Sequence, residues 1–277
     1  MQFLVAESKE LLEFKGRTVN GQKEGYGMLY YQDGGMFYRG NFEANKMHGD
    51  GELFYPDGRI YEGTFSNGSP LGAGKIYFQD GRNYQGEVKN GLPHGYGSLD
   101  YKNGQRYVGN WINGLMDGYG YMKYQDADYE GYWKNGAKNG KGQFTTVDGI
   151  SCRGIFDNGQ LNGYGTCSYR DGSSYRGNWN NGIEQGQGVM ITRFGTRING
   201  IWNNGSFKSG WITKSNGDVY YYDSEQDELE QRLDPRLSTV SSRRDVYNNK
   251  RETSATMRRE AVNGNTKVTN KKSTIFL

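Results

Sequence analysis

The sequence is poor in the residues that build catalytic and metal centres. Its 277 residues include 2 cysteines, Cys152 and Cys167, which are too few for a disulfide scaffold. We interpret both as small apolar fillers in a reducing compartment. Its 2 histidines, His48 and His94, stand at equivalent places before a glycine and have no cluster of cysteines or carboxylates at ligand spacing. We therefore expect no catalytic residue, no cofactor site and no metal site.

The sequence also lacks the features of membrane-spanning, secreted, nucleic-acid-binding and nucleotide-binding proteins. No apolar run approaches the roughly 20 residues of a membrane-spanning helix, and no apolar signal-peptide core follows Met1. A net charge of +3 argues against a nucleic-acid binder that depends on bulk electrostatics. Paired glycines occur, but no G-K-S/T follows them, which argues against a nucleotide loop. These features predict a soluble, cytoplasmic protein without enzymatic activity.

Glycine and aromatic residues are abundant instead. There are 44 glycines and 23 tyrosines, aromatic residues make up 14% of the chain, and the apolar content is only 34%. Aromatic side chains must therefore supply most of the burial. With 4 prolines and no long helical pattern, this composition indicates many short strands that are joined by tight turns.

The glycines stand in register along a repeat of 22 to 24 residues. The repeat is anchored on the glycine of an aromatic-x-Gly motif, followed by an aromatic residue and, nine and eleven residues on, by a Gly-x-Gly pair. The anchors are Gly16, Gly40, Gly63, Gly86, Gly109, Gly131, Gly154, Gly177 and Gly200. A fixed period of this length indicates a repeat architecture, in which each unit buries its apolar face against its neighbours.

Each unit reads as one β-hairpin. About six alternating residues follow each Gly-x-Gly pair and lead to a turn such as Asp57-Gly58, Asp80-Gly81 or Asn103-Gly104. Such pairs favour a type I′ turn, in which both central residues have positive φ. The alternation assigns the tyrosine of Tyr-x-Gly and the glycines to one buried face.

The opposite face carries more aromatic residues than a solvated surface needs. We expect these residues to bind a partner protein, because tyrosine is favoured at interfaces; the alternative is that they serve strand propensity alone. They are Tyr26, Phe54, Tyr77, Tyr96, Tyr119, Tyr121, Tyr132 and Tyr164.

The unit Tyr-x-Gly-x-Trp-x-x-Gly-x-x-x-Gly-x-Gly, followed by an Asp-Gly turn, resembles the MORN repeat. The resemblance implies an all-β fold, an elongated and twisted open sheet of successive antiparallel hairpins with a shallow groove. It also implies a scaffold that binds other proteins in a larger complex, with no small-molecule substrate. Within the family the chain is similar to the short proteins made of repeats alone, such as the radial spoke head components of motile cilia, so a cytoskeletal or axonemal assembly is expected.

The ends of the chain depart from the repeat. We expect an N-terminal cap over 1–15, the repeat sheet over 16–222, a short helix over 223–234 and a basic tail over 235–277 that is disordered or ordered by partners. The tail has 10 Lys or Arg against 3 Asp or Glu. Its basic pairs, which could also tether the protein to an anionic or phosphoinositide membrane, are Arg243 and Arg244, Arg258 and Arg259, and Lys271 and Lys272.

Overall fold

The computed structural model describes residues 11–225 and 228–231, and every regular element in these ranges is a β-strand. The chain divides into two compact units, residues 1–137 and 138–277. In both units each strand pairs antiparallel with the next one along the chain. The predicted all-β fold of antiparallel hairpins is confirmed.

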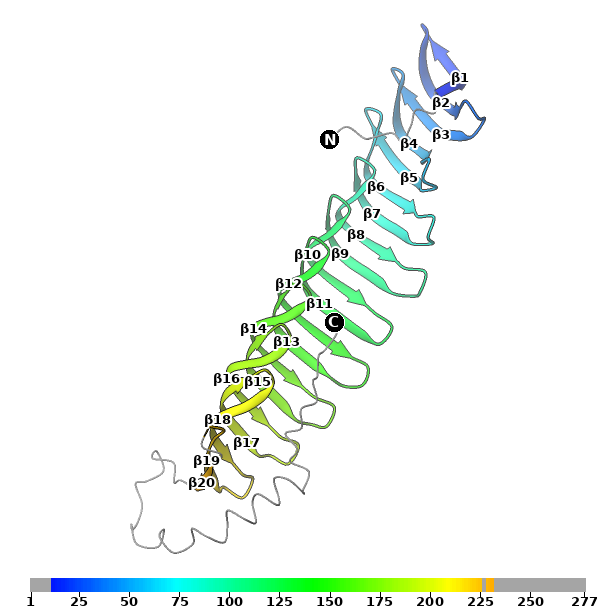
Figure 1. Cartoon of the computed structure of the whole chain (residues 1–277). Coiled ribbons are helices and arrows are strands. Elements are labelled where there is room, and N and C mark those ends of the chain that lie inside the picture. The colour runs from blue at the N-terminus through cyan, green and yellow to red at the C-terminus, as the bar shows by residue number, and fades with distance from the viewer. Residues whose placement is uncertain (1–10, 226–227, 232–277) are drawn as a thin grey trace, which may run out of the picture. The chain divides into compact units, whose positions relative to one another are not determined.

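The first unit is a meander in which consecutive strands lie side by side (Figure 1). Its strands are β1 (Leu11–Val19), β2 (Gln22–Tyr31), β3 (Met36–Glu43), β4 (Lys46–Phe54), β5 (Ile60–Ser66), β6 (Ser69–Tyr77), β7 (Asn83–Lys89), β8 (Leu92–Asp100), β9 (Arg106–Ile112), β10 (Leu115–Lys123) and β11 (Ala127–Lys134). Residues 1–10 of the expected cap lie outside the described ranges, and Leu11 onwards belongs to β1, which pairs with β2.

The second unit continues the same pattern of hairpins. Its strands are β12 (Ala137–Thr146), β13 (Ser151–Asp157), β14 (Gln160–Ser168), β15 (Ser174–Asn180), β16 (Ile183–Ile191), β17 (Arg197–Asn203), β18 (Ser206–Thr213), β19 (Val219–Asp223) and β20 (Glu228–Gln231).

The helix expected over 223–234 is wrong for the described part of that range. Glu228–Gln231 forms β20, which pairs antiparallel with β19, and the backbone N–H of Ser224 donates to the Lys208 carbonyl at 2.8 Å. A helix of two or three turns is marginal in water. A strand added to β19 instead satisfies the open hydrogen-bonding edge of that strand.

Two kinds of turn alternate along the chain. In Asn-Gly turns both residues have positive φ, as in Asn67 (50°) and Gly68 (86°), which is the type I′ geometry. In Asp-Gly turns only the glycine does, so the type I′ geometry expected for Asp57-Gly58 is wrong. There the Gly58 N–H donates to the Tyr55 carbonyl at 3.0 Å, and the Asp57 carboxylate accepts from the Arg59 N–H at 3.1 Å. The longer loop favours a type I turn closed by a left-handed glycine.

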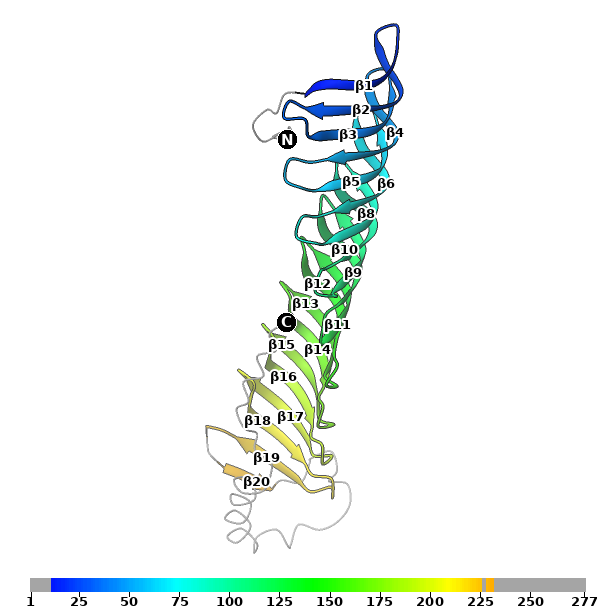
Figure 2. The ribbon, with the colours of Figure 1, turned by 90° about the vertical axis from the view of Figure 1, so that its right-hand side faces the viewer.

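A bulge lies next to the Asn-Gly turn in the β1–β2, β5–β6, β7–β8 and β9–β10 hairpins, and the hairpins of the first unit are bent (Figure 2). Between the pairs Gly63–Gly74 and Phe65–Pro70, three residues of β6 stand opposite one residue of β5. The first glycine of the Gly-x-Gly pair lies in this bulge with positive φ (97° at Gly72). Bulges of this kind bend a strand and increase its twist.

The buried face of each unit holds a ladder of aromatic rings. Tyr107 is fully buried and makes edge-to-face contacts with Trp111 (5.0 Å between centroids) and with Trp133 of the next repeat (5.4 Å). Its hydroxyl donates to the Asn110 carbonyl at 3.0 Å, and Trp111 Nε1 donates to the Gly97 carbonyl at 3.1 Å. Tyr107 therefore joins its own repeat to the next one, and the polar atoms of Tyr107 and Trp111 are satisfied.

Glycine is required beneath these rings because the ring occupies the space of a side chain. A Cβ added at Gly97 would overlap the Tyr84 ring and hydroxyl, and one added at Gly86 would fall 2.7 Å from the Tyr84 hydroxyl oxygen. Gly86 and Gly97 face each other across β7 and β8. The directly paired glycines form a floor on which the tyrosine ring lies.

The expectation that Cys152 and Cys167 are separate apolar fillers is wrong, because a disulfide joins them. Cys152 stands at the tyrosine position of its repeat and Cys167 at the apolar position of the next strand, and the two are direct cross-strand partners. The same two positions pair Tyr84 with Leu99 elsewhere. Both cysteines are buried.

Candidate protein-binding face

The residues that alternate with the aromatic ladder point to the opposite side of each sheet, which we call the outer face. In the first unit they form two rows of cross-strand neighbours on either side of the paired glycines. One row contains Tyr26, Asn41, Asp50, Thr64, Ala73, Glu87, Tyr96, Asn110, Tyr119 and Tyr132. The other contains Met28, Arg39, Glu52, Glu62, Lys75, Gln85, Ser98, Val108, Tyr121 and Glu130.

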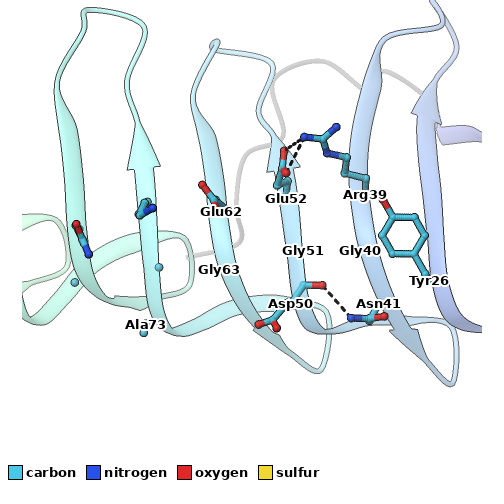
Figure 3. A pocket seen from close by; sticks show the side chains of 14 residues that line it. Tyr26, Arg39, Gly40, Asn41, Asp50, Gly51, Glu52, Glu62, Gly63 and Ala73 are labelled. Atoms are coloured by element: carbon cyan, nitrogen blue, oxygen red, sulfur yellow. Dashed lines mark hydrogen bonds and ion pairs between the residues drawn. The ribbon is translucent and has the colours of Figure 1, made fainter.

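The outer face over β2 to β7 contains a shallow groove of about 700 Å³ (Figure 3). Its polar walls are paired internally. Arg39 binds both carboxylate oxygens of Glu52 at 2.7 Å, and Asn41 Nδ2 donates to the Asp50 carbonyl at 3.3 Å. The hydrogen bond to Glu52 raises the pKa of Arg39 further above its already high value. Arg39 and Glu52 thus neutralise each other within the groove.

A cluster of tyrosines follows the groove on β8, β10 and β11. We call Tyr96, Tyr119, Tyr121 and Tyr132 the tyrosine patch. The Tyr119 and Tyr132 rings meet edge to face at 5.5 Å, and 47% and 51% of these residues remain exposed. Tyr96 is 59% exposed. The patch therefore presents a large aromatic area to solvent, in contrast to the buried ladder behind it.

Carboxylates accompany the tyrosine patch. The Tyr119 hydroxyl donates to Glu130 Oε1 at 2.8 Å, and this hydrogen bond raises the pKa of Tyr119. Burial and a hydrogen bond to Asp128 raise the pKa of Tyr121. These carboxylates were not among the residues that sequence reasoning selected. The cross-strand register identifies them, since it makes Glu130 the direct partner of Tyr121.

Three of the other predicted aromatic residues lie elsewhere in the first unit, and the fourth lies in the second. Tyr26 is exposed at the N-terminal end of the groove. Phe54 is half-buried, with the Arg39 guanidinium 5.8 Å from its ring centroid. The Tyr77 hydroxyl donates to Glu62 at 3.1 Å. Tyr164 is 59% exposed and belongs to the second unit.

Several expectations concern features that the structure describes only in part. The basic pairs of the tail, from Arg243 to Lys272, lie outside the described residues. Within the described ranges no group of three or more His, Cys, Asp or Glu is placed to hold a metal ion. Those same ranges contain no helix of the length and apolar character that a membrane crossing requires. His48 pairs with Glu43 at 3.3 Å, and His94 Nδ1 accepts from the Asn113 N–H at 3.5 Å.

The chain belongs to the MORN-repeat family. The family model matches residues 14–36, 38–58, 61–81, 84–106, 107–128, 129–151, 152–174 and 175–193. The hairpin of β17 and β18 extends the same pairing beyond the last match. MORN repeats are non-enzymatic modules, and they indicate a protein-binding or membrane-associated scaffold.

Solved structures show weak likeness only. The TCP domain of SAS-4 (dCPAP) in complex with a proline-rich motif of Ana2 (dSTIL) of Drosophila melanogaster is 12% identical, with a TM-score of 0.31 over 67% of this chain and 90% of that one. The G-box domain of the microcephaly protein CPAP is 11% identical, with a TM-score of 0.28 over 80% and 99%. Such scores carry no argument about function. No curated protein matches the chain.

Proposed function

We propose that the protein is a non-enzymatic scaffold that binds a segment of another protein through the tyrosine patch. The exposed rings of Tyr96, Tyr119 and Tyr132 carry the proposal. The aromatic ladder lies on the buried face, so these exposed outer rings are not part of the core. Large aromatic side chains that remain exposed on a rigid sheet are favoured at protein interfaces.

The proposed setting is a cytoskeletal or ciliary assembly, such as a radial spoke head. The resemblance of a repeat-only MORN chain to spoke-head components supports this setting. A fluorescently tagged chain is expressed in ciliated cells, and the cells are extracted with detergent. The tagged chain should then remain with the axoneme. A chain that is released entirely with the detergent-soluble fraction would contradict the setting, although not the binding role of the patch.

Affinity capture from the native source tests the binding role. A variant with Tyr96→Ser, Tyr119→Ser and Tyr132→Ser should lose the protein that the wild type retains, at least tenfold by quantitative mass spectrometry, because truncated interface tyrosines are typical hot spots. The matched control is Tyr164→Ser, which removes an equally exposed ring from the second unit and should leave capture unchanged. Circular dichroism should show that both variants are folded. Unchanged capture by the triple variant would overturn the proposal.

The basic tail supports a second candidate, a peripheral membrane tether. The residues before the tail offer no comparable excess of charge, since 23 basic and 22 acidic groups occur over 1–222. Flotation with vesicles of phosphatidylserine and phosphoinositide separates the two candidates. Flotation that is lost when residues 235–277 are deleted would favour the tether, and absence of flotation by the full chain would exclude it.

A further inference from the structure

Arginine, an aromatic ring and a carboxylate recur together in this chain. The Arg59 guanidinium lies 4.6 Å from the Tyr55 ring centroid while its Nε contacts Asp57 at 2.7 Å. Arg82 repeats the arrangement with Phe78 at 4.6 Å and Asp80 at 2.8 Å. On the outer face, Arg39 lies over Phe54 and binds Glu52. In each case the ring face and the carboxylate hold one guanidinium between them.

The tyrosine patch contains two of these three components. Tyr119 and Tyr132 supply exposed rings, and Tyr119 holds Glu130 in place through a hydrogen bond of 2.8 Å. The two rows carry no lysine or arginine over β8 to β11; on the same strands Arg106 pairs with Asp100 at 3.3 Å, and Lys123 is the direct cross-strand partner of Asp128. The members of the two rows from β8 to β11 are Tyr96, Asn110, Tyr119, Tyr132, Ser98, Val108, Tyr121 and Glu130.

We propose that the tyrosine patch binds an arginine side chain in an extended segment of a partner protein, with the guanidinium over the Tyr119 and Tyr132 rings and paired with Glu130. This inference rests on the proposed function and specifies the chemistry of the partner. A planar guanidinium can stack on a ring and bind a carboxylate at the same time, whereas the ammonium of lysine is a point charge that is more strongly hydrated.

Charge complementarity favours this occupant over an anionic one. The only charged residue in the two rows from β8 to β11 is the carboxylate of Glu130. Over β12 to β15, the corresponding rows of the second unit carry Lys141, Arg153 and Arg176 as their charged residues. An acidic peptide or an anionic lipid surface would therefore be attracted to the second unit, and an arginine to the patch of the first.

Titration calorimetry of the full chain with three designed peptides tests the inference. The probes are acetyl-(Gly-Ser-Arg)₃-amide and the same peptide with lysine or citrulline in place of arginine. We expect the arginine peptide to bind at least fivefold more tightly than the lysine peptide and at least tenfold more tightly than the citrulline peptide. Citrulline keeps the planar shape and loses the charge, so it isolates the contribution of the cation.

Variants identify the site. Glu130→Gln and Tyr119→Ser should each weaken the arginine peptide by about tenfold, and the matched control Tyr164→Ser should leave its affinity within twofold of the wild type. Equal binding of the citrulline peptide, no measurable binding of the arginine peptide at millimolar concentration, or an affinity that Glu130→Gln leaves unchanged would each overturn the inference.

The same variants separate this inference from the proposed function. If Glu130→Gln retains the native partner while the triple tyrosine variant loses it, the patch is a binding site that does not use an arginine, and only the inference fails. If both variants retain the partner, the proposed function fails as well. If Glu130→Gln loses the partner, and citrulline at a partner arginine does the same, both are supported.

Discussion

The repeats at 84–106 and 152–174 fill the same space by different means. In the first, the Tyr84 ring covers the glycine pair Gly86 and Gly97, and its hydroxyl donates to the Glu87 carbonyl at 2.6 Å. In the second, a disulfide stands where the tyrosine and its apolar partner would pair, so no tyrosine ring covers the corresponding glycines.

A neighbouring side chain takes part of the vacated volume. Leu161 Cδ2 lies 2.9 Å from the position that a Cβ on Gly154 would occupy and 3.3 Å from that on Gly165. Among the described residues, Trp179 Nε1 has no hydrogen-bond partner, whereas the Nε1 atoms of Trp111 and Trp202 donate to glycine carbonyls at 3.1 and 3.3 Å. The repeat thus requires a filled volume above its glycines, and the tyrosine also organises the polar contacts around it.

Breaking the disulfide should produce the largest change in stability. The bridge closes a separation of 15 residues, for which the loss on reduction is about 3 kcal/mol. Urea unfolding followed by tryptophan fluorescence, with and without a reductant, measures the loss as a lower midpoint.

A double variant converts the second repeat into the first. Cys152→Tyr with Cys167→Leu reproduces the Tyr84–Leu99 pair, and its unfolding midpoint should not respond to the reductant. A wild-type midpoint that is also unaffected by complete reduction would contradict the stabilising role of the bridge.

A substitution at one repeat position should have different effects in the two repeats. Gly97→Ala places a methyl group inside the Tyr84 ring, and we expect a loss of about 2 to 3 kcal/mol in the free energy of unfolding. Gly165→Ala meets its nearest atoms, Arg153 O and Leu161 Cδ2, at 3.2 and 3.3 Å, so its loss should stay below about 1 kcal/mol. Equal midpoints in urea for the two variants would show that the ring does not set the requirement for glycine.

The stability of the region next to the disulfide repeat should depend on pH, because this region contains the buried Lys138. The Gly159 N–H in its Asn-Gly turn donates to the carbonyl of Lys138 at 2.9 Å, whereas the Asn90 N–H of the first repeat donates to Pro70. Lys138 is only 5% exposed, with its Nζ 4.7 Å from the Phe144 ring centroid, and burial lowers its pKa from 10.5 to about 8.

Between pH 8 and 9 the unfolded chain binds more protons at Lys138 than the folded chain does, so stability should rise with pH, by about 1 kcal/mol. From about pH 10 the buried tyrosines, such as Tyr84 and Tyr107, whose pKa values burial raises, should make stability fall again. Lys138→Met, which copies Met116 of a neighbouring repeat, should stabilise the chain at pH 7 and abolish the rise. Chemical unfolding at several pH values measures both effects, with Lys141→Met as the exposed control. A rise that persists in Lys138→Met would assign it to another group.

Much of the fold follows from local patterns. The period of the glycines predicts the hairpins, and alternation within single strands predicts that Tyr84 and Trp111 are buried while Tyr96 and Tyr119 are exposed. Strand parity needs no knowledge of the partner strand. The Asp-Gly turns were assigned to the wrong type because the dipeptide does not reveal how many residues the loop contains.

The candidate site was predictable only in part. Its tyrosines could be selected from parity, but their grouping required the cross-strand register, which makes Tyr119 and Tyr132 direct partners and sets Glu130 beside Tyr121. The register also makes Cys152 and Cys167 direct neighbours. The position of each cysteine within its own repeat suggests two separate fillers, because it does not show which residues face each other across strands.

The sequence by itself determined the repeat, the hairpins and the two faces of each strand, because these depend on spacing along a single segment. The tertiary structure alone decided which side chains meet across strands: the disulfide, the tyrosine–carboxylate patch and the pairing of β20 with β19 in place of a helix. Such contacts depend on bulges and loop lengths, which shift the register between strands and leave the alternation along each strand intact.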